Sequence, residues 1–217
     1  MPLAAHAQQG GRVRLVGILL SQVEGNQEAK DRVAALREAL KNFGWVEGRD
    51  VRFELRYAGG SADRMRAEAV ELIKLRPDVI VASATASLAA LQKTTTTIPI
   101  VFTQVTDPVG AGFVTSLARP GGNITGFTQH DFSIGVKWLE LLKELAPSTA
   151  GVLWNRQHRL HKQAASYVDR ILKGEKPTDL PVQNATKFEL VINLKTTKAL
   201  GINPSNSLLA RTDAVIE

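Results

Sequence analysis

The sequence predicts an α/β fold with a doubly wound, mostly parallel sheet, followed by a truncated second α/β lobe. Three observations lead to this prediction. Short apolar runs alternate with amphipathic stretches through residues 12–127, as in parallel sheets covered by helices. Polar residues follow directly after several of those runs, where the carboxyl ends of parallel strands form a binding edge. Beyond residue 155 the alternation breaks, and too few elements follow to complete a lobe of about 100–150 residues.

The first three elements follow from their apolar spacing. Arg14–Leu20 is an apolar run ending at Ser21, typical of a central parallel strand. Glu28–Phe43 carries apolar residues three or four apart and is predicted to be a helix, with Gly44 as its left-handed C-cap. Asp50–Tyr57 alternates apolar and charged residues, which predicts an edge strand.

The next helix and strand are bounded by clear capping and breaking residues. Ser61 is placed to cap a helix that must end before Pro77. Asp78–Ala82 is a short apolar run and is predicted to be a strand. Ser83–Ala86 then turns into a helix that continues through Gln92.

A βαβ unit is predicted between residues 98 and 128. Ile98–Phe102 forms a buried strand, and Gln104–Thr106 forms a polar loop at its carboxyl end. Asp107 is expected to cap a helix whose first residue is Pro108, because Pro lacks the N–H that has no partner there. Ile124–Phe127 follows as a second strand.

The remaining elements are fewer and shorter. We predict, in order, a helix at Asp131–Leu145, a strand at Ala150–Trp154, a basic stretch at Arg156–Lys162, a helix at Ala164–Leu172, a loop at Gly174–Pro181, a strand at Phe188–Ile192 and a helix at Thr196–Leu200. We expect the Ala164–Leu172 helix to pack back onto the first lobe through Ala165, Val168 and Leu172 or Ile171.

Composition excludes several classes of protein. The net charge of +6 arises from Lys and Arg residues interleaved with Glu and Asp, so we expect a solvated surface and no nucleic-acid binding. No segment approaches the roughly 18 apolar residues of a membrane-spanning helix. The chain has no cysteine, which excludes disulfides and thiolate chemistry.

Residues 1–11 resemble the tail of a secretory signal. Ala5-His6-Ala7 has the small-x-small pattern of a cleavage site, although the basic and most of the apolar regions of a signal are missing. An unstructured Ala-rich terminus is the alternative. The first interpretation predicts a periplasmic protein with a signal sequence truncated at its start.

Four blocks carry a resemblance to a known family. They are LARPGGNITGFT (Leu117–Thr128), LELLKELAP (Leu139–Pro147), AASYVDRILKGEKPTDLPVQ (Ala164–Gln183) and TKFELVINLKTTKALG (Thr186–Gly201). Together they resemble the ABC-transporter substrate-binding proteins related to the tryptophan/tyrosine-binding components. The resemblance implies a type-1 periplasmic binding fold, with two lobes, a hinge and a small solute in the cleft between them. It also implies delivery of that solute to ABC permease subunits in the membrane, with no catalysis, cofactor or metal.

The chain departs from the family in one segment. In the family a long segment separates the strand that matches 150–155 from the helix that matches 164–172, and here it has shrunk to residues 156–163. We therefore assign 12–127 and 162–175 to the first lobe, and 128–161 and 176–217 to the hinge and an incomplete second lobe. The deletion is expected to impair binding. The chain should be a monomer unless apolar surface exposed on the stub drives self-association.

The candidate ligand-binding residues lie just beyond the predicted strands. The start of a helix offers free N–H groups and a partial positive charge, so the helix after Ser83 could hold a ligand carboxylate. Each such residue could instead be an ordinary cap, and for Asp107, which precedes Pro108, we favour that interpretation. The candidates are Ser21, Ser83, Thr85, Ala86, Thr106, Asp107 and Thr128.

Alternative functions have less support in the sequence. His158 and His161 lie in a basic stretch without neighbouring carboxylates, so we expect a solvated surface pair and not a metal site. The chain has no G-x-S-x-G elbow, and no G-x-G-x-x-G or P-loop follows the first strand. The leading hypothesis is a solute receptor for an amino acid or similar small molecule. The alternatives are a single-lobe enzyme or nucleotide-binding regulator, and a truncated product that binds nothing.

Overall fold

The chain divides into two compact units in a computed structural model that describes residues 12–128, 158–184, 191–199, 201–212 and 214–216. The first unit comprises residues 1–129 and 157–183, and the second comprises residues 130–156 and 184–217. The predicted helix at 131–145 and strand at 150–154 lie outside the described residues.

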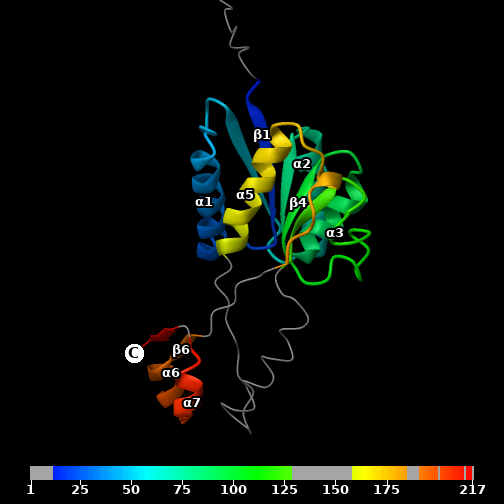
Figure 1. Ribbon diagram of the computed structural model, residues 1–217. Helices are drawn as coiled ribbons and strands as arrows, with labels where there is room; N and C mark the ends of the chain where they lie inside the picture. The colour runs from blue at the N-terminus through cyan, green and yellow to red at the C-terminus, as the bar shows by residue number, and fades with distance from the viewer. Residues whose placement is uncertain (1–11, 129–157, 185–190, 200, 213, 217) are drawn as a thin grey trace, which may run out of the picture. The chain divides into compact units, whose positions relative to one another are not determined.

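A five-stranded, wholly parallel sheet forms the centre of the first unit (Figure 1). Its order is β2-β1-β3-β4-β5, so the direction of strand addition reverses beside β1 and the sheet is doubly wound, as predicted. The charged, alternating strand lies at one edge, also as predicted. The strands are β1 (Arg14–Leu20), β2 (Val51–Tyr57), β3 (Val79–Ser83), β4 (Ile100–Val105) and β5 (Ile124–Thr128).

Helices cover both faces of this sheet. α1 (Gln27–Asn42) and α5 (His158–Leu172) pack against each other on one face, and α2 (Ala62–Lys74) and α3 (Thr85–Thr94) pair on the other. Figure 1 shows α1 and α5 side by side. Because both faces are covered, β1 is apolar and buried along nearly its whole length. A Cβ on Gly17 would lie 3.0 Å from Leu72 Cδ1, so α2 packs directly over that glycine.

The cap predicted at Ser61 is confirmed, and Asn26 caps α1 as well. The Asn26 side chain accepts a hydrogen bond from Ala29 N at 3.0 Å, and Ser61 Oγ accepts one from Arg64 N at 3.3 Å. Gly44 has a φ of +93°, which confirms its predicted left-handed conformation after α1.

The helix predicted to begin at Pro108 does not form. Residues 106–117 are turns, and a single helical turn is closed by Ala111 N donating to Asp107 O at 3.1 Å. Asp107 does cap that turn, because its Oδ1 accepts from Gly110 N at 2.8 Å. Gly112 then takes a φ of +71° and stops the helix, and glycine disfavours helix continuation in any case.

The packing prediction for the Ala164–Leu172 segment is confirmed. Ala165, Val168 and Leu172 are all buried in the core shared with α1 and the sheet. The helix begins earlier than predicted, at His158. Its Tyr167 ring lies 4.7 Å from that of Phe127, and burial raises the pKa of the Tyr167 hydroxyl against the opposing effects of Gln183 and Arg170.

The segment that follows α5 packs with the first unit. The sequence analysis grouped residues 176–183 of this segment with the second lobe. A short 3-10 helix, η1 (Pro177–Asp179), leads to Leu180 and Val182, which are both buried. Thr125 Oγ1 donates to Leu180 O at 2.6 Å, and Val182 N donates to Leu117 O at 2.7 Å. Apolar burial and these hydrogen bonds hold the segment beside β5.

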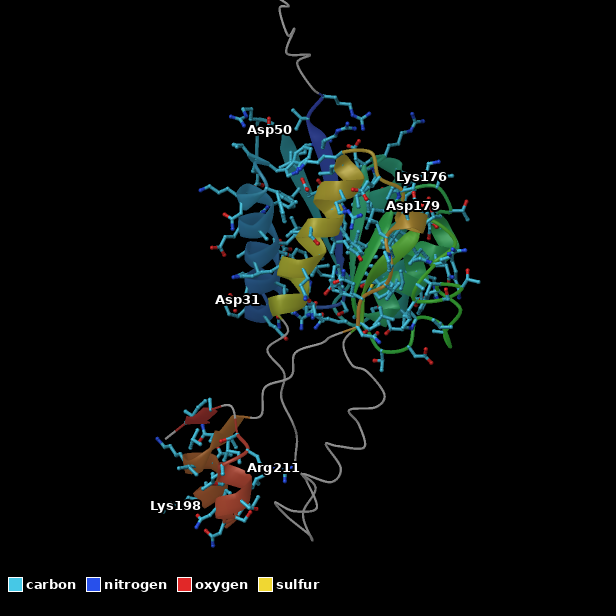
Figure 2. The ribbon with its side chains drawn as sticks, viewed as in Figure 1. Asp31, Asp50, Lys176, Asp179, Lys198 and Arg211 are labelled. Atoms are coloured by element: carbon cyan, nitrogen blue, oxygen red, sulfur yellow. The ribbon has the colours of Figure 1, made fainter. Side chains whose placement is uncertain are left out.

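The described part of the second unit is small. It comprises β6 (Val191–Asn193), α6 (Leu194–Ala199), α7 (Asn206–Leu209) and β7 (Ala214–Ile216), with β6 and β7 paired in parallel. Its described charged residues are all basic, and Figure 2 shows two of them, Lys198 and Arg211. No helix in the described part of the chain has the length and apolarity needed to span a bilayer.

We expect Leu172→Ala to lower the free energy of unfolding by about 2–5 kcal/mol, because it leaves a cavity under α5. Leu172 is only 4% exposed. Val70→Ala on α2, at a position 41% exposed, is the control and should change stability by less than about 0.5 kcal/mol. Equal effects of the two substitutions in urea denaturation would contradict the packing of α5 on the sheet.

Asp78 joins the amino ends of β1 and β3. Its carboxylate accepts hydrogen bonds from Leu15 N at 2.8 Å, Arg12 at 2.8 Å and Arg14 at 3.0 Å. Burial opposes ionisation, but these three donors outweigh it and hold the pKa of Asp78 below its ordinary value. A carboxylate with a lowered pKa contributes stability above its unfolded pKa, and that stability is lost as the pH falls through the folded pKa.

Asp78→Asn should therefore lower the free energy of unfolding at pH 7 by about 1–2 kcal/mol. The difference from the wild type should shrink as the pH falls below about 3.9, where the unfolded carboxyl is protonated. Denaturation at a series of pH values measures this gap. Asp179→Asn, at an exposed position (Figure 2), is the control. A gap for Asp78→Asn that stays constant down to pH 2 would show that its ionisation is irrelevant to folding.

Candidate functional site

The carboxyl ends of the five parallel strands meet at one edge of the sheet, the lower edge of the first unit in Figure 1. The chain leaves β1 toward α1 on one face and leaves β3 toward α3 on the other, so the ends of these two neighbouring strands form a topological switch point. In open α/β sheets this switch point is where ligands bind. All of the predicted ligand-binding residues lie along this edge, at Ser21, Ser83, Thr85, Ala86, Thr106, Asp107 and Thr128.

The side chains of these residues differ in solvent exposure. The side chains that reach the surface belong to Thr85, Ala86, Thr106 and Asp107, with Ser21 half-buried. By contrast, Ser83 is 0% and Thr128 is 1% exposed. The edge therefore has an outer layer, which a ligand could touch, and an inner layer that supports it. Whether any of the seven contacts a ligand stays a prediction.

Gln104 lies in a bulge at the end of β4. Thr103 pairs with Phe127 and Val105 with Thr128, so Gln104 has no opposing residue in β5. Its φ of 61° is unusual for a residue other than glycine. The sequence analysis placed Gln104 in a polar loop, but it lies within the strand, only 7% exposed. Its Oε1 accepts a hydrogen bond from Ser83 Oγ at 3.1 Å.

Ala84 begins α3 in a conformation that only glycine adopts readily. Its φ is 91° and its ψ is 160°. Ala84 at the N-cap position has no side-chain acceptor, whereas Asn26 and Ser61 cap α1 and α2. Within the described part of the chain, the first backbone N–H groups of α3 therefore lie at the switch point without a side-chain cap. A helix start of this kind suits an anionic ligand group, such as a carboxylate.

His161 is buried and is not the solvated surface residue that the sequence analysis predicted. Its side chain is 0% exposed, and its Nε2 lies 3.3 Å from Thr103 Oγ1 on β4. The prediction was wrong because α5 begins at His158, so that His161 falls on the buried face one turn before Ala165. The His158 side chain lies outside the described residues. Among the described residues, no group of His, Cys, Asp and Glu is placed to hold a metal ion.

Two hollows on the described surface lie beside the edge strand β2, away from the start of α3. One of ≈ 390 Å³ is lined by Glu24, Leu55, Arg56, Tyr57, Arg64 and Glu68. The other, of ≈ 360 Å³, is lined by Lys30, Val33, Ala34, Arg37, Leu55 and Tyr57. Both flank the edge strand β2 and contain no predicted ligand-binding residue. The candidate site is assigned to the strand ends and the start of α3, and not to either hollow.

The fold and this edge define a lobe of the periplasmic-binding-protein type. The model of the family described as ABC transporter substrate binding protein matches residues 18–156 and 148–216. The chain therefore belongs to the ABC transporter substrate binding protein family.

Individual proteins are similar to this chain in sequence or in fold. The tyrosine-binding protein of Clostridioides difficile (strain R20291) is 37% identical over 120 residues, which is 54% of this chain and 34% of that protein. The match thus spans about a third of the relative's length. A Streptococcus pneumoniae ABC domain solved in complex with L-Trp has a TM-score of 0.83 at 19% identity, covering 94% of this chain and 100% of that one. A conserved domain protein from Vibrio cholerae has a TM-score of 0.83 at 24% identity, with the same coverage.

We expect Ala84→Gly to raise the free energy of unfolding by roughly 1 kcal/mol, because glycine relieves the unfavourable backbone conformation. Ala89→Gly, in the interior of the same helix, is the matched control and should lower it by about 1 kcal/mol. Thermal and urea denaturation of the two variants measure the difference. Destabilisation of similar size in both would show that Ala84 is not strained.

Proposed function

We propose that this chain is the solute receptor of an ABC importer and that its ligand is an aromatic amino acid. Support comes from its family, from relatives whose names or complexes specify tyrosine and L-Trp, and from the sheet edge. The observation that carries the proposal is the start of α3 at the switch point of the sheet, where the N-cap residue Ala84 provides no side-chain cap. The enzyme and nucleotide-binding alternatives have no comparable support.

The two charged groups of an amino acid suit different parts of this edge. In the proposed arrangement, the ligand carboxylate accepts hydrogen bonds from the first N–H groups of α3 and from the exposed Thr85 hydroxyl. The ammonium group lies toward Asp107, whose carboxylate is exposed beyond β4. Ser83 and Thr128 are buried, so their proposed part is to support this surface.

The proposed partners are a small solute and the permease subunits of the importer, with no nucleic acid, and the proposed compartment is the periplasm. The assignment of residues 1–11 to the remnant of a signal peptide belongs to this proposal. Binding alone is proposed, with no catalysis, cofactor or metal. A monomer is expected unless apolar surface such as Val215 and Ile216, each 45% exposed, drives self-association.

The affinity of this chain is expected to be weak. Receptors of this type close two lobes around the ligand, and that closure excludes water. The described second unit consists of four short elements, so we assign ligand contacts to one wall only. On an open wall each hydrogen bond contributes about 0.5–1.5 kcal/mol net, which barely offsets several kcal/mol lost on immobilising the ligand.

NMR titration with L-Trp and L-Tyr tests this proposal. We expect saturable binding with a Kd weaker than about 1 μM, and Thr85→Ala should weaken it by roughly tenfold. Thr96→Ala, at an exposed position beyond α3, is the control and should bind like the wild type. The absence of any chemical-shift change up to millimolar ligand would reject the proposed receptor function. Micromolar or tighter binding by a monomer would contradict the expectation that the deletion impairs binding.

A further inference from the structure

The bulge in β4 takes the polar residue Gln104 out of the alternation of side chains between the two faces of the sheet. Ile100 and Phe102 pack toward α2 and α3, and Val101 packs toward α5. Simple alternation would turn Gln104 toward α2 and α3, and Val105 toward α5. Val105 is instead buried in the core beside α2 and α3. The bulge thus keeps Val105 in that core and leaves the Gln104 side chain to lie along the strand ends.

The Gln104 amide lies across the end of β3. Ser83 Oγ donates to its Oε1 at 3.1 Å, and both residues are buried. The Ser83 carbonyl in turn accepts a hydrogen bond from Ser87 Oγ in the first turn of α3, at 2.9 Å. A continuous set of hydrogen bonds therefore links Gln104 to the start of α3.

Further hydrogen bonds hold two unfavourable backbone conformations at the ends of β3 and β4. Ala84 and Gln104 both have positive φ, and such conformations persist only where the surroundings impose them. Ala84 N donates to Thr103 O at 3.0 Å, and the Thr103 hydroxyl lies 3.3 Å from His161 Nε2 on α5. The ends of β3 and β4 are thereby fixed to each other and to α5.

We propose that Gln104 is a positioning residue: its buried amide holds Ser83, and through Ser83 the first N–H groups of α3, in the orientation that receives the ligand. This inference rests on the proposed function, because it assigns the ligand to that helix start. It predicts that Gln104 affects binding without touching the ligand, and that the effect passes through Ser83.

Amide hydrogen exchange of the ligand-free protein tests the positioning directly. Leu88 N donates to Ala84 O at 3.2 Å in the first turn of α3. Gln104→Ala should speed exchange at Leu88 about tenfold, because one buried hydrogen bond that orders this turn is lost. The amide of Met65, which donates to Ser61 O at 2.9 Å in the first turn of α2, is the internal control and should not change. Unchanged exchange at Leu88 would overturn the proposal.

Ligand affinity then shows whether the positioning matters for binding. Gln104→Ala and Ser83→Ala should each weaken L-Trp or L-Tyr binding about tenfold, and the double variant should be no weaker than either single one. Gln92→Ala is the control. The Gln92 amide donates a hydrogen bond to Gly112 O on the surface, and its removal should leave ligand affinity unchanged. Additive losses at Gln104 and Ser83 would overturn the coupling.

A glycine variant separates positioning from general stability. Gln104→Gly relieves the positive φ but removes the amide, so the Tm should hold or rise while affinity falls about tenfold. An increase in Tm with unchanged affinity would overturn the proposal. If the wild type binds neither amino acid, the proposed function fails, and exchange at Leu88 still decides whether Gln104 positions α3.

Discussion

The burial of the sheet under α5 is the interaction on which the rest of the first unit depends. A parallel sheet buries both faces, and α1 lies over only part of the face that it shares with α5. Val81, Val101 and Phe127 share a core cluster with α5 residues, and α5 contacts β3, β4 and β5. Without α5 these strands would expose a continuous apolar surface. The lobe is complete only when a segment from far along the chain returns to it.

The same helix ties the core to the candidate site. His161 on α5 lies 3.3 Å from Thr103, the last residue of β4 before the bulge, so α5 contributes both to the apolar core and to the contacts at the candidate edge. At the opposite end of the sheet, Asp78 fixes the amino ends of β1 and β3 through a backbone amide and two arginines. The candidate edge thus carries exposed polar side chains such as Thr106 and Asp107, whereas Asp78 at the other end is satisfied within the protein.

Sequence patterns predicted most of the fold, because strands buried on both faces and amphipathic helices leave clear periodic signals. The charged alternation of Asp50–Tyr57 identified an edge strand, and Ser61 and Gly44 cap their helices as predicted. The helix at Pro108 failed because a good cap was followed by glycines that do not sustain a helix.

The errors at the candidate site have a different cause. The position of the strand ends was predictable, because parallel strands bring their carboxyl ends to one edge. The role of Gln104 depends on a bulge, and a bulge leaves no periodic pattern in the sequence. The sequence signal was a polar residue, Gln104, set between Thr103 and the apolar Val105 at the end of the run IVFTQV. His161 was misplaced because its burial depends on where α5 begins, and the basic residues around it suggested solvent.

The hydrogen bond from Trp45 Nε1 to Asp169 Oδ1, 2.9 Å long, has a consequence for the time course of folding. Its partners are 124 residues apart in the chain, and it joins the end of α1 to α5. Contacts of such long range require a large loop to close before they stabilise anything, which slows folding. During synthesis the strands of the first unit emerge long before the helix that covers them. Until that helix has been made, the strands that it covers have no α5 to bury their apolar face.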